Sequence, residues 1–153
     1  MVNEMKALKI FEVANFERGG NPLERLKIGK ADLLRNEERL DELSIEELIT
    51  LVSDMKLVTR EGYGGENQYG FLPEYVDKRI HKEAKQMPNS SHTYDTWDSY
   101  SLYKIISDSE ESKKAIMYIS VRSDRGSCFR TRMVNYKEEV HTEYVVDWDN
   151  KIS

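Results

Sequence analysis

A basic strip towards the C-terminal end of the chain has the residue types best suited to chemistry. Between residues 113 and 137 the only acid is Asp124. Side chains alternate along a strand, so residues spaced by two share one face, where arginines could hold phosphates and aromatic rings could stack on bases. The strip therefore predicts a nucleic-acid-binding sheet face made by Arg122, Arg130, Arg132 and Tyr136, with Tyr118 on the neighbouring strand.

Internal pairing is the competing interpretation of the same strip. Glu143 and Asp147 fall on one face of the next predicted strand and could lie opposite the arginines as cross-strand partners. The net charge of −5 and the pI near 5.3 also disfavour a protein that coats nucleic acid, although they leave room for a local basic patch. We therefore favour pairing and keep nucleic-acid binding as the alternative.

Histidines beside carboxylates are the other residues that could do chemistry. His92 is followed by Asp95 and His141 by Glu143, but neither spacing matches a metal-ligand signature. Cys128 is the only cysteine, which excludes an intramolecular disulfide, and its place in an alternating strand favours a packed thiol. We predict no catalytic residue, no metal and no cofactor. A small hydrolase built around His92 or His141 is the least favoured alternative.

Two predicted surface features suit contact with a partner. The run EGYGGENQYG lacks the phosphate-loop patterns and is expected to be a loop that displays two tyrosines. An acidic face on the preceding helices is most simply solvated, but it could also occupy a nucleic-acid-binding groove of a host enzyme. The predicted partner-binding residues are Tyr63, Tyr69, Glu38, Asp41 and Glu42, and the acidic face also includes Glu37, Glu46 and Glu47.

The N-terminal part, residues 1–86, is predicted to be helical with a small hairpin. Its clearest start signal is the capping box of Ser44 and Glu47, which opens a run of apolar residues at helical spacing. The predicted elements are helices at 4–15, 31–40, 45–54 and 73–86 and a hairpin of strands at 56–60 and 71–72.

The C-terminal part, residues 92–153, follows a linker-like segment at residues 87–91, MPNSS. We expect a helix over 97–106, WDSYSLYKII, and then three alternating strands, AIMYISVR, CFRTRMVNY and HTEYVVDW. The predicted fold class is α+β: an N-terminal helical part with a small hairpin, then a helix and a three-stranded antiparallel β-meander. The two parts could still form one compact domain.

The least generic stretch of the chain is residues 16–29, FERGGNPLERLKIG. Asn21 suits a helix N-cap, Pro22 suits the first helical position, and Gly29 can end the helix. The stretch resembles an N-terminal motif of small uncharacterised bacteriophage proteins, F-x-R-G-x-[DN]-P-x-x-x-[LM]-x-I-G. The matching residues are Phe16, Arg18, Gly19, Asn21, Pro22, Leu26, Ile28 and Gly29. The resemblance implies a phage origin and no particular activity.

The length, the composition and the motif together favour a binding protein. A chain of 153 residues with nine tyrosines can form one domain with aromatic side chains to spare for interfaces. No apolar run is long enough to span a membrane, and the expected location is the cytoplasm. We expect a non-enzymatic accessory protein of phage type that binds and modulates a host protein, such as a defence or transcription component. A nucleic-acid-binding module is the alternative, and a homo-oligomer is compatible with the same features.

Overall fold

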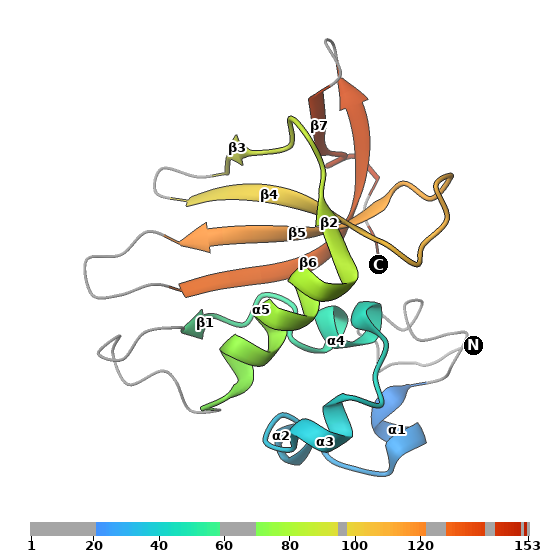
Figure 1. The fold of residues 1–153 in the computed structure, drawn as a ribbon, viewed down its shortest axis with the longest axis vertical. Helices are drawn as coiled ribbons and strands as arrows, with labels where there is room; N and C mark the ends of the chain where they lie inside the picture. Colours follow the sequence, from blue (N-terminus) through green and yellow to red (C-terminus); the bar gives the residue numbers. More distant parts are fainter. Residues whose placement is uncertain are drawn as a thin grey trace.

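The protein is built on a seven-stranded antiparallel sheet, as the computed structural model shows (Figure 1). The structure describes residues 21–58, 70–94, 98–121, 128–139, 143–150 and 152. The strand order is β1-β6-β5-β4-β2, with β3 also beside β4 and β7 also beside β6. The strands are β1 (Leu57–Val58), β2 (Ala84–Gln86), β3 (His92–Thr93), β4 (Asp98–Ile105), β5 (Lys114–Val121), β6 (Cys128–Glu139) and β7 (Glu143–Val146).

Five short helices accompany this sheet in the part of the chain that is described. They are α1 (Pro22–Leu26), α2 (Lys30–Leu33), α3 (Glu37–Leu40), α4 (Ile45–Leu51) and α5 (Leu72–Glu83). Helices α1 to α3 lie together at one end of the molecule, while α5 crosses the sheet and leads directly into β2 (Figure 1). None of these helices is long and apolar enough to cross a membrane.

The predicted helix-led α+β fold with a three-stranded meander is wrong, because the sheet dominates. The largest error is residues 97–106, predicted as a helix: residues 98–105 form β4, which pairs with β5 from Asp98 to Tyr103. Within β4, Tyr100 and Leu102 face one side and Tyr103 and Ile105 the other. The apolar residues of WDSYSLYKII fit a period of two as well as the helical period, and pairing with β5 decides between them.

Two further elements differ from the prediction for local reasons. Strand β1 pairs with β6 instead of forming a hairpin with residues 71–72, since Phe71 caps α5 and Leu72 is its first residue. The predicted helix over 31–40 is divided into α2 and α3, because the side chain of Asn36 accepts a hydrogen bond from the backbone of Arg39 and starts a new helix. The helix predicted over 73–86 ends at Glu83.

Other local predictions are confirmed. The Ser44–Glu47 capping box opens α4, and Asn21 and Pro22 start α1 as expected. However, α1 ends at Leu26 and is capped by Lys27 in a left-handed conformation, with φ of 55°, while Gly29 is the N-cap of α2. The helix predicted over 4–15 lies outside the described residues.

The two faces of the sheet have separate cores. The first core packs α2 to α5 against the face that carries Ile105, Ile116, Phe129 and Met133. The second core lies on the opposite face and is centred on Leu102, Met117 and Ile119, which are almost fully buried. Aromatic residues Tyr100 and Tyr136 belong to this second core. Burying both faces explains why β4 and β5 lack a polar side.

The sheet curls into a half-barrel around the second core. Strand β6 is long enough to pair with β5 from Cys128 to Asn135 and with β7 from Tyr136 to Glu139. Strand β7 then reaches the segment before β3, where the backbone N–H of Tyr144 donates to Asn89 O over 3.0 Å. The segment predicted as a linker, residues 87–91, connects β2 to β3, and both strands pair with β4. We call the sheet face inside this curl the concave face.

Candidate binding surfaces

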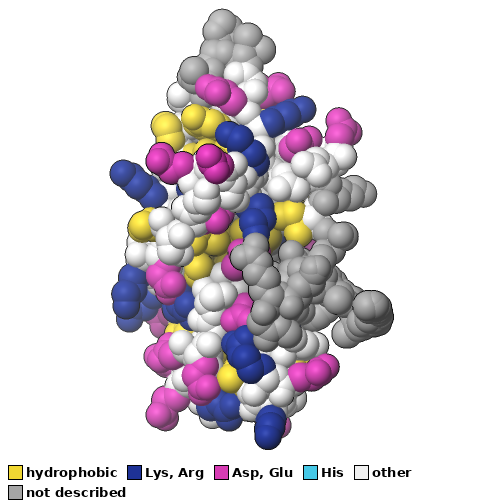
Figure 2. Space-filling view, turned by 90° about the vertical axis from the view of Figure 1, so that its right-hand side faces the viewer, with side chains coloured by type: hydrophobic (Ala, Val, Ile, Leu, Met, Phe, Trp, Pro, Cys, Tyr) yellow, Lys and Arg dark blue, Asp and Glu magenta, His cyan; other side chains and the backbone are white. Residues whose placement is uncertain are grey.

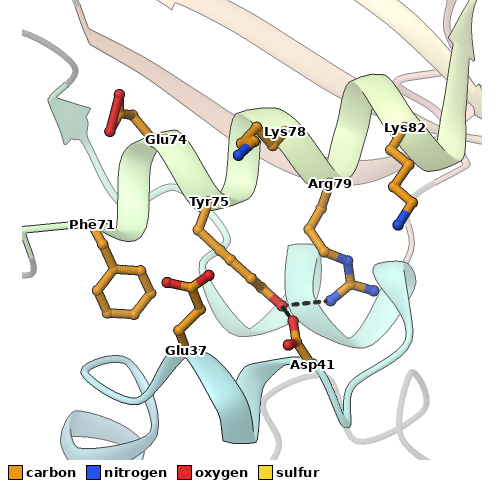
Figure 3. A pocket seen from close by; sticks show the side chains of 8 residues that line it. All are labelled: Glu37, Asp41, Phe71, Glu74, Tyr75, Lys78, Arg79 and Lys82. Carbon is orange, nitrogen blue, oxygen red and sulfur yellow. Dashed lines mark hydrogen bonds between the residues drawn. The ribbon is translucent and has the colours of Figure 1, made fainter.

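A groove between α3 and α5 is the first candidate site (Figure 3). Its cavity volume is about 350 Å³. Helix α5 supplies most of the lining, and α3 with the residue after it closes the opposite side. The lining residues are Glu37, Asp41, Phe71, Glu74, Tyr75, Lys78, Arg79 and Lys82. We call this feature the α3–α5 groove.

The floor of the α3–α5 groove is a fixed polar network. The Tyr75 hydroxyl donates to Asp41 Oδ1 over 2.6 Å and accepts from the Arg79 guanidinium over 3.0 Å. Arg79 also donates to the backbone oxygens of Leu40 and Leu43, over 3.3 and 3.0 Å. These bonds tie α5 to the segment between α3 and α4, so the floor is held in one arrangement.

The protonation states of this network are well defined. Burial, together with the hydrogen bond to Asp41, raises the pKa of Tyr75 to about 12, so the phenol stays neutral at physiological pH. Burial alone would lower the pKa of Arg79, but its hydrogen bonds with Glu83 and Tyr75 raise it overall. The floor therefore joins the Arg79 cation to Asp41 through the neutral hydroxyl of Tyr75.

The rim of the α3–α5 groove carries charges sorted by sign. Glu37 and Glu74 lie at the end near Phe71, while Lys78 and Lys82 lie further along α5 (Figure 3). All four residues are exposed, and none of their side chains forms an ion pair or hydrogen bond within the described ranges. Glu74 and Lys82 are about 12 Å apart along the helix axis, at about 1.5 Å per residue. The rim of the groove therefore carries acidic and basic side chains, unpaired among the described residues, near the partly exposed ring of Phe71.

Most of the predicted acidic face is paired within the protein. Asp41 accepts from Tyr75, Glu42 pairs with Arg39 over 2.9 Å and Glu47 pairs with Arg25 over 2.7 Å. Glu46 pairs with Lys114 of β5 over 3.0 Å. Of the predicted partner-binding acids, Glu38 alone is exposed without a polar side-chain partner in the described part of the chain. Tyr63 and Tyr69 lie outside the described residues.

The structure separates the predicted nucleic-acid-binding residues. By register, Arg130 and Arg132 share the concave face with Tyr136, as the alternation predicts. Tyr118 pairs with Thr131 and therefore lies on the other face, where its hydroxyl donates to Asp77 of α5 over 2.8 Å. Its ring stacks on Phe129 with centroids 4.8 Å apart. Arg122 lies outside the described residues.

Neither tyrosine of the predicted basic face is free to stack on a base. Tyr136 is buried in the second core, and the ammonium groups of Lys104 and Lys113 lie 5.3 and 5.7 Å from its ring centroid. One face of the Tyr118 ring is covered by Phe129, and its hydroxyl is bound to Asp77. The combination of arginines with Tyr118 and Tyr136 as one surface is therefore wrong.

The partner of Arg130 is also different from the one predicted. Its guanidinium lies 3.1 Å from Asp98 at the start of β4, instead of pairing with Glu143 or Asp147. Glu143 lies 3.8 Å from His92, whose other ring nitrogen is 3.0 Å from the Tyr144 carbonyl. The sequence did not predict Asp98 as the partner of Arg130, because the prediction places Asp98 in a helix instead of the strand β4.

Sequence reasoning missed an exposed aromatic pair on the concave side. Trp148, just after β7, is 49% exposed and stacks on Tyr94, with centroids 5.8 Å apart and ring planes 19° apart. Tyr94 in turn packs edge-on against Tyr100. A tryptophan in the polar run DWDN is a usable signal, since such a position favours exposure of the ring.

The cysteine and histidine side chains in the described residues are packed or paired within the protein. Cys128 is buried in β6, and His81 of α5 lies beside Asp77 of the same helix and Tyr103 of β4. His141 and Asp95 lie outside the described residues. Within the described ranges, no three His, Cys, Asp or Glu side chains converge as metal ligands.

The face seen in Figure 2 has acidic and basic side chains interspersed, with apolar atoms visible between them. Recognition on such a surface depends on local groups of side chains and not on a large field of one sign. Comparison with protein-family models, with curated proteins and with solved structures finds no match to this chain.

Proposed function

We propose that this chain is a non-enzymatic binding protein of phage type that engages and modulates a host protein through the α3–α5 groove. The observation that carries the proposal is the sorted rim, in which four exposed charges without internal partners flank Phe71. Exposed charges that pair with nothing internally remain available to a partner. The resemblance of residues 16–29 to phage proteins supports the origin.

The rigid floor favours binding because it lowers the cost of ordering the site. Tyr75, Asp41 and Arg79 are already locked by hydrogen bonds, so a partner does not have to immobilise them. The edge of Phe71 packs on Tyr75 with centroids 6.0 Å apart and remains partly exposed. A partially exposed aromatic on a fixed base is typical of the anchor in a protein interface.

The charge order of the rim specifies the partner segment. A complementary segment carries a basic side chain opposite Glu37 and Glu74 and an acidic side chain opposite Lys78 and Lys82. Between them, an apolar side chain would contact Phe71. A cavity of about 350 Å³ is large enough to accommodate side chains of a protein segment.

The test is affinity capture from a bacterial lysate, with and without nuclease, using two matched double variants. Glu74→Lys/Lys82→Glu exchanges one charge at each end of the rim and so destroys the sorting by sign without changing the net charge. Lys85→Glu/Glu138→Lys makes the same exchange at exposed residues outside the groove. We expect a protein that survives nuclease treatment, is captured by the wild type and the control, and is at least tenfold depleted with the rim variant. Equal capture by all three proteins would refute the groove as the binding site.

A further inference from the structure

The concave face carries a second group of side chains that the α3–α5 groove does not use. It consists of Tyr94, Arg130, Arg132 and Trp148, and we call it the aromatic–arginine patch. Arg130 and Arg132 are two residues apart on β6, so their side chains leave the same face of the sheet. Tyr94 follows β3, and its backbone N–H donates to Asp98 O over 2.9 Å. Because the Asp98 side chain also binds Arg130, Tyr94 lies beside Arg130, with Trp148 stacked on Tyr94 and Arg132 next along the same face of β6.

Both guanidinium groups have hydrogen-bonding capacity that the described residues leave unused. Arg130 reaches Asp98 through one terminal nitrogen, whereas its Nε is buried and has no acceptor there. Arg132 is half-buried opposite Met117 and has no ion pair or hydrogen bond of its side chain in the described part of the chain. Half-buried guanidinium donors are normally satisfied, and a phosphate can accept from the terminal nitrogens of both arginines, whereas the buried Nε of Arg130 is out of its reach.

The aromatic pair supplies a platform of the right kind beside these donors. Trp148 is 49% exposed and is backed by Tyr94, which rests on Tyr100 of the second core. A ring held from behind keeps its outer face available to another planar group. Nucleobases stack on such rings regardless of sequence, while neighbouring arginines hold the backbone.

We infer that the aromatic–arginine patch binds single-stranded nucleic acid, with a base stacked on Trp148 and the adjoining phosphate held by Arg132 and Arg130. The site keeps Arg130 and Arg132 of the sheet face predicted from the sequence, but its aromatic side chains are Tyr94 and Trp148 instead of Tyr118 and Tyr136. Asp98 neutralises part of the Arg130 charge, and the whole chain carries −5. Binding is therefore local, weak and strongly dependent on salt.

The test is fluorescence anisotropy of labelled 12-mer oligodeoxythymidylate and oligoadenylate, titrated with the full-length protein at low and physiological salt. We expect binding at low salt that weakens as salt rises, with a slope of about −0.7 for each phosphate neutralised. Trp148→Leu should weaken binding roughly tenfold or more, because stacking on one aromatic is lost. Arg132→Gln should weaken it about fivefold and make the salt slope shallower by about 0.7.

Matched controls separate these effects from general loss of charge or apolar surface. Lys85→Gln removes an exposed cation elsewhere, and Ile106→Ala removes an exposed apolar side chain that is 64% accessible. Both should bind like the wild type, as should the rim variant of the α3–α5 groove, so this test is independent of the proposed function. Folding of each variant is checked by circular dichroism.

Three outcomes would overturn the inference. The first is no anisotropy change with either oligonucleotide at low salt. The second is binding that Trp148→Leu and the controls affect equally. The third is displacement of the 12-mer by adenosine monophosphate at a concentration equal to that of the nucleotides in the 12-mer. Such a result would show that the site binds a free nucleotide and not a strand.

Discussion

Replacing Arg79 by methionine tests whether the floor of the α3–α5 groove fixes α5 to the rest of the protein. Methionine retains an unbranched apolar stem but removes the guanidinium. The change deletes the bonds to Tyr75, Leu40 and Leu43 and the ion pair with Glu83. The Arg79 side chain is only 13% exposed, so water replaces these bonds incompletely.

The magnitude follows from the number and type of bonds lost. A hydrogen bond to a charged group contributes about 1.5–3 kcal/mol, but these contributions are not additive, and the freed carbonyls can recover some water. We expect Arg79→Met to lower the free energy of unfolding by about 2–4 kcal/mol. Lys82→Met, on the same helix and without a side-chain partner in the described residues, should change it by less than about 0.5 kcal/mol.

The assay is urea denaturation at neutral pH followed by circular dichroism, with the slope m compared between proteins to confirm that the same transition is observed. A loss below about 1 kcal/mol for Arg79→Met, or a loss equal to that of Lys82→Met, would refute the reasoning. In that case the hydrogen-bond network would contribute little to stability, and the floor of the groove would not be rigid.

Three other substitutions test separate parts of the structure. The pKa of Tyr75 is about 12 in the folded protein against an ordinary value of 10.0, so its stabilising contribution is fully present below about pH 10 and is lost as pH rises towards 12. The wild type should therefore lose on the order of 2 kcal/mol more than Tyr75→Phe between about pH 9 and pH 12 in urea titrations, and a pH-independent difference would contradict this. Thr131→Val should stabilise the protein by about 0.5–1 kcal/mol, since its buried hydroxyl has no partner in the described residues; a clear loss in urea denaturation would show that the hydroxyl is satisfied. Ser44→Ala should cost about 1 kcal/mol by removing the capping box of α4, and no change in the unfolding midpoint would argue against that cap.

The capping signals in the sequence predicted the starts of α1 and α4 correctly. Asn21, Pro22 and the Ser44–Glu47 box act within one helical turn, so their residues alone determine the caps. The strands after residue 114 are also predicted, because their β-branched and aromatic residues alternate with a period of two and do not follow the spacing of a helix. Their antiparallel pairing as β5, β6 and β7 is present, but within a seven-stranded sheet.

The parts of the structure that the sequence did not predict depend on contacts between residues far apart in the chain. Tyr75 and Asp41 are 34 positions apart, and Arg130 and Asp98 are 32 apart. Both faces of β5 are apolar enough to be buried, and β6 carries an aromatic residue on each face, so alternation did not reveal that α5 covers Tyr118 while the curl of the sheet buries Tyr136. The curl of the sheet also determines which aromatic side chain stays exposed. That residue is Trp148, which lies outside the basic strip at residues 113–137.

The most direct test of the central claim is photo-crosslinking from the rim of the α3–α5 groove. A benzophenone side chain is placed at Lys78 in one protein and at Lys85 in a control, and both are irradiated in nuclease-treated bacterial lysate. Both residues are exposed lysines without a side-chain partner in the described ranges, so neither replacement disturbs the fold. We predict a covalent adduct with one host protein from position 78 and none from position 85. Adducts from position 85 alone, or the same set from both positions, would contradict the proposed function.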